Sequence, residues 1–235
     1  MLESRGIATT VLGLARPTLE KAQPPRSLFV PFELGRPVGE PNDAAFQARV
    51  LQQALGLLDR HDGPVILVDF PDDAPGATDQ AQWHPPLPSC GAGTTRDIAR
   101  WIADVSAEIA LLRPAWEQAR QASGRTTVGV SGQPPQDWAE FAASFMTGAT
   151  PGTVTHTSPA LALRYLIDDL KAYYGEAAQA HEAAPSSRQI NQWFWRETIA
   201  GAFVLALREA CIGSPNKAID TVASRFFVPR PYLPD

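Results

Sequence analysis

The stretch SLFVPFELGRPVGEPNDAAFQARVLQQALGLL, Ser27 to Leu58, decides the fold of the first part of the chain. It opens with a short apolar run, SLFVPF, of the kind that forms a buried strand. Asn42 is a suitable helix cap. Apolar residues then recur at helical spacing: Phe46, Val50, Ala54 and Leu58. A second apolar run, PVILVDF at 64–70, follows. Strand, helix and strand in this order predict a parallel βαβ unit.

A further strand is expected before this unit. GIATTVLGL at 6–14 is apolar and β-branched with a glycine at its entrance, which is typical of a strand buried on both faces. MLESRG before it reads like the last turn of a helix, as though an α/β domain were entered partway through. We therefore expect residues 1–73 to form a flavodoxin- or Rossmann-like half-domain, which a preceding domain or a partner chain could accompany.

After the third apolar run, the pattern typical of strands and helices stops. Residues 72–88 are rich in Pro, Asp, Gln and Ala and lack apolar periodicity, which predicts a long surface connection, and 74–93 are assigned as a linker loop. Residues 94–235 are predicted to be predominantly helical. The predicted class is thus α/β, with an amino-terminal parallel βαβ sheet half followed by a mostly helical carboxyl-terminal half.

The helical part shows clear start signals. Thr94 or Thr95 is the expected cap of a first helix, which Pro114 kinks or ends. Ser158 and Ser214, each followed by proline, start two more. The other elements expected are a strand at 126–130, a helix at 136–146 and an aromatic-rich buried helix at 187–212, through part of whose surface we expect the protein to dimerise.

Composition narrows the classes of function. The chain has 235 residues, a net charge of -5 and no dense run of Lys or Arg, so nucleic acid and anionic membrane surfaces are not expected partners. No apolar segment reaches the roughly 18 residues of a membrane span. Cys90 and Cys211 have neither disulfide-framework nor zinc spacing, which favours a reducing cytoplasm.

Cys90 is the candidate nucleophile. It lies in SCGAGTTRD, a glycine-rich turn just before a helix, where free amides and the helix dipole lower a thiol pKa. The same geometry could cradle a phosphate or carboxylate, with Arg96 nearby to bind it. The alternative is an ordinary glycine turn and helix cap.

Three further charged residues are candidates. Glu33 and Arg36 flank Gly35 at the carboxyl end of a predicted strand, where open α/β sheets bind ligands. They could contact a polar substrate, or the Pro and Gly around them could serve only to shape the turn. Glu197 falls within an apolar helix, which makes it a candidate acid or base. Its alternative is a structural salt bridge with Arg164 or Arg208.

Metal and cofactor chemistry is not predicted. The four histidines fall in predicted loops or helix ends, and Glu-x-x-His pairs are absent. No nucleophile-elbow, Walker or complete dinucleotide motif is present. Asp168 and Asp169 are expected on a solvated helix edge. We expect no metal and no cofactor.

The order of RGIATTVLGL, VPFELGRPVGEP and AFQARVLQQALGLL resembles the carboxyl-terminal region of selenoprotein B subunits of the glycine, sarcosine and betaine reductases. The matching positions are Gly6 and Ile7, then Pro31, Leu34, Gly35 and Pro37, within about the first 60 residues. The resemblance implies an α/β fold and reductive cleavage of a carbon–nitrogen bond by a selenocysteine or cysteine, working with partner subunits. The catalytic selenocysteine motif has no counterpart that can be placed here.

Two hypotheses of function follow. In the first, the chain is a thiol-dependent reductase in which Cys90 acts on a small carboxylated amine or related metabolite held by Arg36 or Arg96. In the second, it is a non-catalytic binding or complex-forming subunit that associates with a partner subunit or as a homodimer. Reactivity of Cys90 at neutral pH separates them, because only the first requires a depressed thiol pKa.

Overall fold

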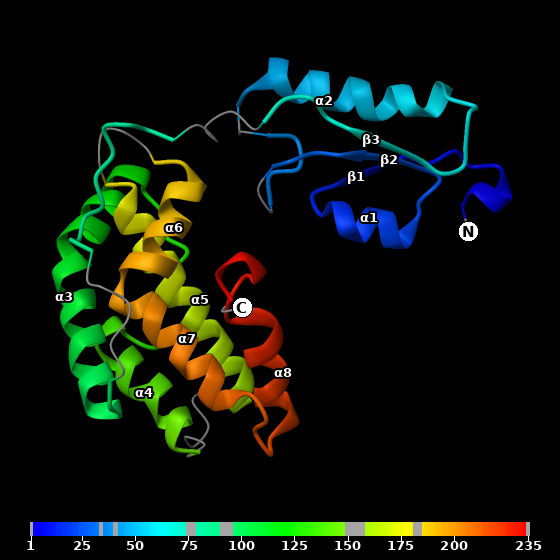
Figure 1. Cartoon of the computed structure of the whole chain (residues 1–235). Helices are drawn as coiled ribbons and strands as arrows, with labels where there is room; N and C mark the ends of the chain where they lie inside the picture. Colours follow the sequence, from blue (N-terminus) through cyan, green and yellow to red (C-terminus); the bar gives the residue numbers. More distant parts are fainter. Residues whose placement is uncertain are drawn as a thin grey trace. The chain divides into compact units, whose positions relative to one another are not determined.

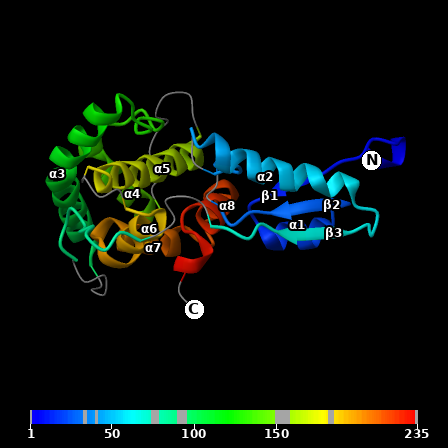
Figure 2. The same ribbon diagram turned by 90° about the horizontal axis from the view of Figure 1, so that it is seen from above.

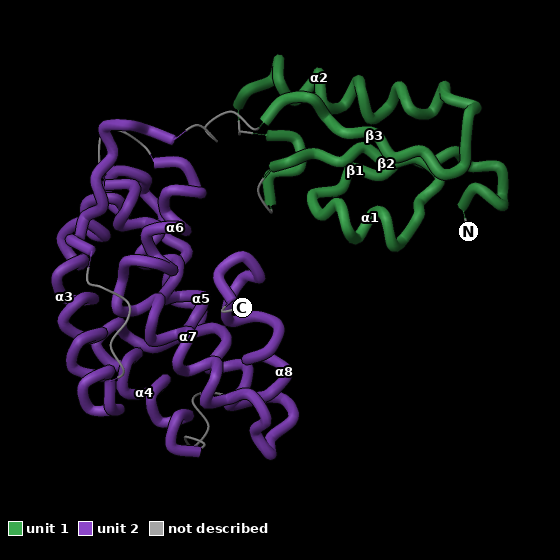
Figure 3. Tube along the Cα trace, in the orientation of Figure 1, with its two compact units in different colours: residues 1–78 green, residues 79–235 purple. Residues whose placement is uncertain are grey.

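The structure is a computed structural model that describes residues 2–32, 35–39, 42–73, 79–89, 96–148, 158–180 and 185–233. The chain divides into two compact units, Met1–Thr78 (unit 1) and Asp79–Asp235 (unit 2) (Figure 3). Unit 1 contains a three-stranded parallel sheet with helices, and unit 2 is helical. The predicted fold class is confirmed.

Unit 1 is built on strands β1 (Val11–Gly13), β2 (Arg26–Phe29) and β3 (Ile66–Asp69). The order is β1-β2-β3 and both pairings are parallel. Helices α1 (Arg16–Ala22) and α2 (Ala44–Gly56) cover opposite faces of this sheet (Figures 1 and 2). Short 3-10 helices at Glu3–Arg5 and Leu57–Asp59 complete the unit.

The strands are shorter than the sequence predicts. Only Val11–Gly13 of the run 6–14 pairs with β2, and Val11 is exposed, so the expectation of a first strand buried on both faces is wrong. Among the strands that the structure describes, β1 lies at the edge of the sheet and pairs only with β2. The short helix α1, with Pro17 in its first turn, was not expected from the sequence.

The core of unit 1 forms between β2 and α2. Leu28 and Val30 are fully buried, and α2 buries Phe46, Val50 and Ala54 as its periodicity predicts. The cap is Asp43, whose carboxylate accepts from the Phe46 N–H at 3.0 Å, instead of the expected Asn42. Asp43 has a non-helical backbone, whereas Asn42 adopts a positive φ of 67° in the preceding turn.

Unit 2 contains six α-helices among its described residues. They are α3 (Ile98–Ser123), α4 (Trp138–Ser144), α5 (Pro159–Ala178), α6 (Ser187–Glu197), α7 (Ile199–Cys211) and α8 (Lys217–Phe226). The 3-10 helices are Pro135–Asp137, Phe145–Thr147 and Arg230–Tyr232. α3 packs against both α5 and α7 (Figure 1).

Side-chain caps set where these helices begin. Ser158 accepts from the Leu161 N–H and starts α5 as predicted. Asp97 caps α3; the expected caps Thr94 and Thr95 lie outside the described residues. α8 is capped by Asn216 and not by Ser214. α3 continues through Pro114 to Ser123, so proline does not end it.

Two other predicted elements are wrong. The single helix expected at 187–212 is two helices, because Thr198 between α6 and α7 has an extended backbone. Residues 126–130 form a turn instead of a strand. The aromatic side chains of α6, which are Trp193, Phe194 and Trp195, are buried in the unit 2 core, and dimerisation through part of the 187–212 surface stays a prediction.

None of the helices in the described parts of the chain combines the length and apolarity that crossing a membrane requires.

Candidate functional site

The proline- and glycine-rich corner after β2 is shaped by its backbone. Gly35 and Gly39 have φ of 92° and 95°, a region that side-chain-bearing residues rarely adopt. The Gly39 N–H donates to the Arg36 carbonyl at 3.0 Å, which closes the turn. Arg36 is exposed on this corner, and Glu33 lies outside the described residues. Turn geometry therefore accounts for the glycines at 35 and 39.

Two arginines lie at the carboxyl edge of the sheet, and both are engaged. Arg16 forms an ion pair with Asp69, at the end of β3. Arg49, on α2, pairs with Asp72. Its guanidinium also lies over the Phe46 ring, 5.5 Å from the centroid. The positive charge that an anionic ligand would need is thus largely neutralised by these acids.

Arg96 is held inside unit 2. Its Nε donates to an Asp104 carboxylate oxygen at 3.0 Å, and both side chains are mostly buried. The guanidinium also lies 4.8 Å from the centroid of the Trp101 ring. This arrangement fastens the segment before α3 to the helix itself, which is a structural role.

Of the two predicted catalytic residues, Cys90 and Glu197, the structure describes only Glu197. Cys90 lies outside the described residues. Glu197 is the last residue of α6 and is half-buried, so its carboxylate is not sealed from solvent. The arginines expected to pair with it, Arg164 and Arg208, form ion pairs with Asp168 and Glu209.

A buried carboxylate is found instead at Glu108 on α3. Its Oε1 accepts from the Ile199 N–H at 2.9 Å, and its Oε2 accepts from the Ala200 N–H at 2.8 Å and the Tyr174 hydroxyl at 2.7 Å. Burial raises the pKa of Glu108, although these three donors and the charge of Arg96 act in the opposite direction. Both oxygens are occupied, so this acid serves as a cap for α7.

The junction between α6 and α7 depends on two further residues. The Thr198 hydroxyl accepts from the Gly201 N–H at 3.0 Å and so caps the same helix turn. At Gly201 a side-chain Cβ would lie 2.0 Å from the Phe194 carbonyl oxygen, so only glycine fits. The burial of Glu108 can be predicted from the sequence, because Glu108 falls between Val105 and Leu112 on the apolar stripe of α3.

Asp169 is also buried, which corrects the prediction that it lies on a solvated helix edge. Its carboxylate accepts from three consecutive N–H groups, those of Gly129, Val130 and Ser131, at 2.8–3.0 Å. Seven residues along α5, Glu176 accepts from the side chain of Thr126 and from both the N–H and the hydroxyl of Thr127.

The two acids of α5 therefore fasten the 126–131 turn to the helix. Burial would raise the pKa of Glu176, but the hydrogen bonds from Thr127, Thr126 and Trp116 outweigh it and the pKa is lowered. The β-branched TTVGV run predicts a strand, yet its amides bond to side chains and not to another strand.

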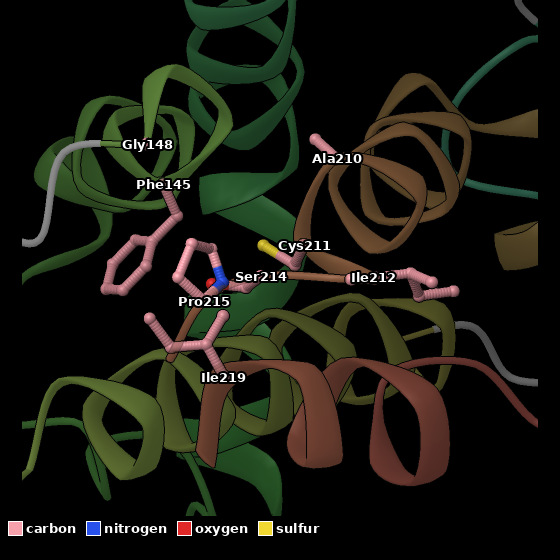
Figure 4. A pocket seen from close by; sticks show the side chains of 9 residues that line it. Phe145, Gly148, Ala210, Cys211, Ile212, Ser214, Pro215 and Ile219 are labelled. Atoms are coloured by element: carbon pink, nitrogen blue, oxygen red, sulfur yellow. The ribbon is translucent and has the colours of Figure 1, made fainter. Parts of the chain in front are cut away.

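A pocket of about 200 Å³ lies at the end of α7 (Figure 4). Cys211 lines it, with Phe145 and Pro215 beside the thiol. Burial raises the pKa of the Cys211 thiol to about 11, so it is protonated at neutral pH and unreactive. The volume is below the roughly 300–1,000 Å³ of typical ligand sites. Cys211 is a core residue.

In the described segments, no three His, Cys, Asp or Glu side chains lie close enough together to hold a metal ion.

The exposed apolar side chains are concentrated in unit 1. Of ten large ones among the described residues, six belong to unit 1, which is about a third of the chain. They are Leu2, Ile7, Val11, Leu51, Leu55 and Val65. Leu51 and Leu55 lie one turn apart on α2 and are 45% and 57% exposed. These six side chains are called the unit 1 apolar surface below.

Comparison of the chain with family models, curated proteins and solved structures found no match in any of the three. The resemblance of the first 60 residues to selenoprotein B stays a prediction.

Proposed function

We propose that the chain is a non-catalytic, complex-forming subunit whose unit 1 docks to another protein chain. The observation that carries this proposal is the unit 1 apolar surface. Singly exposed leucines are normal on proteins, but Leu51 and Leu55 lie one turn apart on α2, and six of the ten exposed large apolar side chains among the described residues belong to this small unit.

The energetics favour covering this surface. Leu51 and Leu55 each leave about half of the side chain in water, and burying the rest of each would contribute on the order of 1 kcal/mol. The two outer edges of the sheet, on β1 and β3, also carry backbone groups without a strand partner.

The charged groups of unit 2 fit the same proposal. Arg96 is engaged by Asp104, and the buried acids Glu108 and Asp169 cap a helix and a turn. We place the subunit in the cytoplasm, because Cys211 is a free, buried thiol in a chain whose cysteines have no disulfide spacing.

The test is site-specific photo-crosslinking in the cells that make the protein. The photoreactive amino acid p-benzoylphenylalanine replaces Leu55 in one variant and Leu111, which is 70% exposed on α3 of unit 2, in the control. We expect a discrete adduct from position 55, lost when Leu51→Lys is added, and none from position 111. Equal adducts at both positions, or none at 55, would contradict the proposal.

The thiol-reductase hypothesis is tested separately by the pH dependence of Cys90 alkylation, with Cys90→Ser as the control. An apparent pKa well below the ordinary value of about 8.5 would favour catalysis over the complex-forming role. A pKa at or above that value is the result that the complex-forming role predicts.

A further inference from the structure

The outward side of α2 carries a regular apolar stripe. Its members are Ala44, Ala48, Leu51 and Leu55, all exposed, with spacings of four, three and four residues. This is the spacing with which one helix packs along another. The stripe lies away from the buried side of the helix, which is formed by Phe46, Val50 and Ala54.

The stripe is free of charge. Arg49 is the one charged residue of α2, and it is held off the stripe by its ion pair with Asp72 and by the rings of Phe46 and Phe70. A surface without charge can meet an identical surface with no repulsion between like charges. The neighbouring Gln52 is polar and uncharged, which suits the rim of such a contact.

Side-chain size increases along the stripe, so two copies of the stripe in antiparallel orientation have complementary shapes. The small residues, Ala44 and Ala48, come first, and the large ones, Leu51 and Leu55, come last. If two copies of α2 pair antiparallel about a two-fold axis between 48 and 51, Leu51 faces Ala48 of the other copy. Leu55 then faces Ala44 of the other copy, so that every large side chain meets a small one. Parallel pairing would instead place leucine against leucine and leave space between the alanines.

We propose that α2 pairs antiparallel with α2 of a second copy of this chain, with Leu55 against Ala44 and Leu51 against Ala48. This inference rests on the proposed function and names the partner for its surface. Two 13-residue helices bury less than the standard interface of about 800 Å² per partner. The dimer is therefore weak, with a Kd on the order of tens of micromolar.

The test is disulfide trapping between single-cysteine variants, each made in full-length Cys90→Ser protein. Cys211 can stay, because it is buried. Ala44→Cys and Leu55→Cys are oxidised separately and as an equimolar mixture, at a concentration above the expected Kd. The control is Leu111→Cys, which gives the yield from random collision at an exposed site of unit 2.

The antiparallel arrangement predicts that the mixture forms a disulfide-linked dimer at least several-fold above the control, while each variant alone stays at the control level. A disulfide dimer of Leu55→Cys alone would indicate parallel pairing and would overturn the inference. Control-level yield in all samples would also overturn it. In that case, photo-crosslinking of position 55 to a different chain would leave the proposed function standing, whereas loss of that adduct would remove both.

Discussion

The carboxylate of Glu108, on α3, accepts a hydrogen bond from the backbone N–H of Ala200, the second residue of α7, at 2.8 Å. This contact joins residues 92 positions apart. With the Ile199 N–H and the Tyr174 hydroxyl on the same carboxylate, it determines where α7 begins.

Replacing Glu108 by alanine is expected to lower the free energy of unfolding of unit 2 by about 2–4 kcal/mol. The N–H groups of Ile199 and Ala200 and the Tyr174 hydroxyl would stay buried without an acceptor. All six tryptophans lie in unit 2, so tryptophan fluorescence during urea unfolding reports on this unit. Glu117→Ala, at an exposed position of the same helix, is the control and should change stability by less than about 0.5 kcal/mol. Equal effects of the two substitutions would contradict the role given to Glu108.

The stability of the protein relative to Glu108→Gln should fall as pH rises from 4.5 toward neutrality. The folded-state pKa of Glu108 is raised above its ordinary value of 4.5, so in this window the folded protein binds more protons than the unfolded chain. As pH rises, Glu108 ionises and its buried charge lowers the free energy of unfolding. As pH falls to 4.5, the carboxyl group is protonated and this loss disappears. Glu176, whose pKa is lowered, is present in both proteins and cancels in the difference. Unfolding at a series of pH values measures this difference, and a flat or rising curve would be the contrary result.

Gly201→Ala should destabilise unit 2 by about 2 kcal/mol or more, against the usual preference of helices for alanine. The added Cβ would lie 2.0 Å from the Phe194 carbonyl oxygen, which is backbone and cannot rotate away. The matched change Gly175→Ala, inside α5 with open space around it, should be neutral or stabilise by up to about 1 kcal/mol. Urea unfolding of both variants provides the measurement, and a stabilising Gly201→Ala would show that α6 and α7 do not meet as described.

Substitution of Asp169 should destabilise unit 2 much more than substitution of its neighbour Asp168. Asp169→Ala removes the shared acceptor of three consecutive N–H groups in the 126–131 turn and should cost about 2–4 kcal/mol. Asp168→Ala removes partly exposed ion pairs to Arg164 and Lys171 and should cost less than about 1 kcal/mol. Amide hydrogen exchange of residues 129–131 gives a local check, since only Asp169→Ala should speed it. Equal exchange in the two variants would contradict this account of the turn.

The sequence correctly predicts the elements whose local residue pattern is compatible with only one type of secondary structure. The spacing of Phe46, Val50 and Ala54 between two apolar runs leads to β2, α2 and β3, and Ser158 followed by Pro159 marks the start of α5. These signals are local, so tertiary contacts do not change them.

Other parts depend on contacts between distant residues. The apolar pattern continues through Thr198, and the break there reflects its cap and the Glu108 carboxylate from another helix. Thr126 to Val130 have strand-forming side chains, but Asp169 and Glu176 bind their amides in a turn. Of the site residues, the exposed face of α2 could have been found from the spacing of Ala44, Ala48, Leu51 and Leu55, since a second apolar stripe on a helix needs a second partner.

The central claim is that α2 carries the contact surface of a complex-forming protein, with a second copy as its partner. Sedimentation velocity of the full chain from about 1 to 500 µM tests it most directly, alongside Leu55→Lys and the unit 2 control Leu111→Lys. We predict a shift from monomer to dimer over tens of micromolar in the wild type and in Leu111→Lys, and a monomer throughout in Leu55→Lys. A wild-type protein that stays monomeric at 500 µM, or a dimer that Leu55→Lys leaves intact, would contradict the claim.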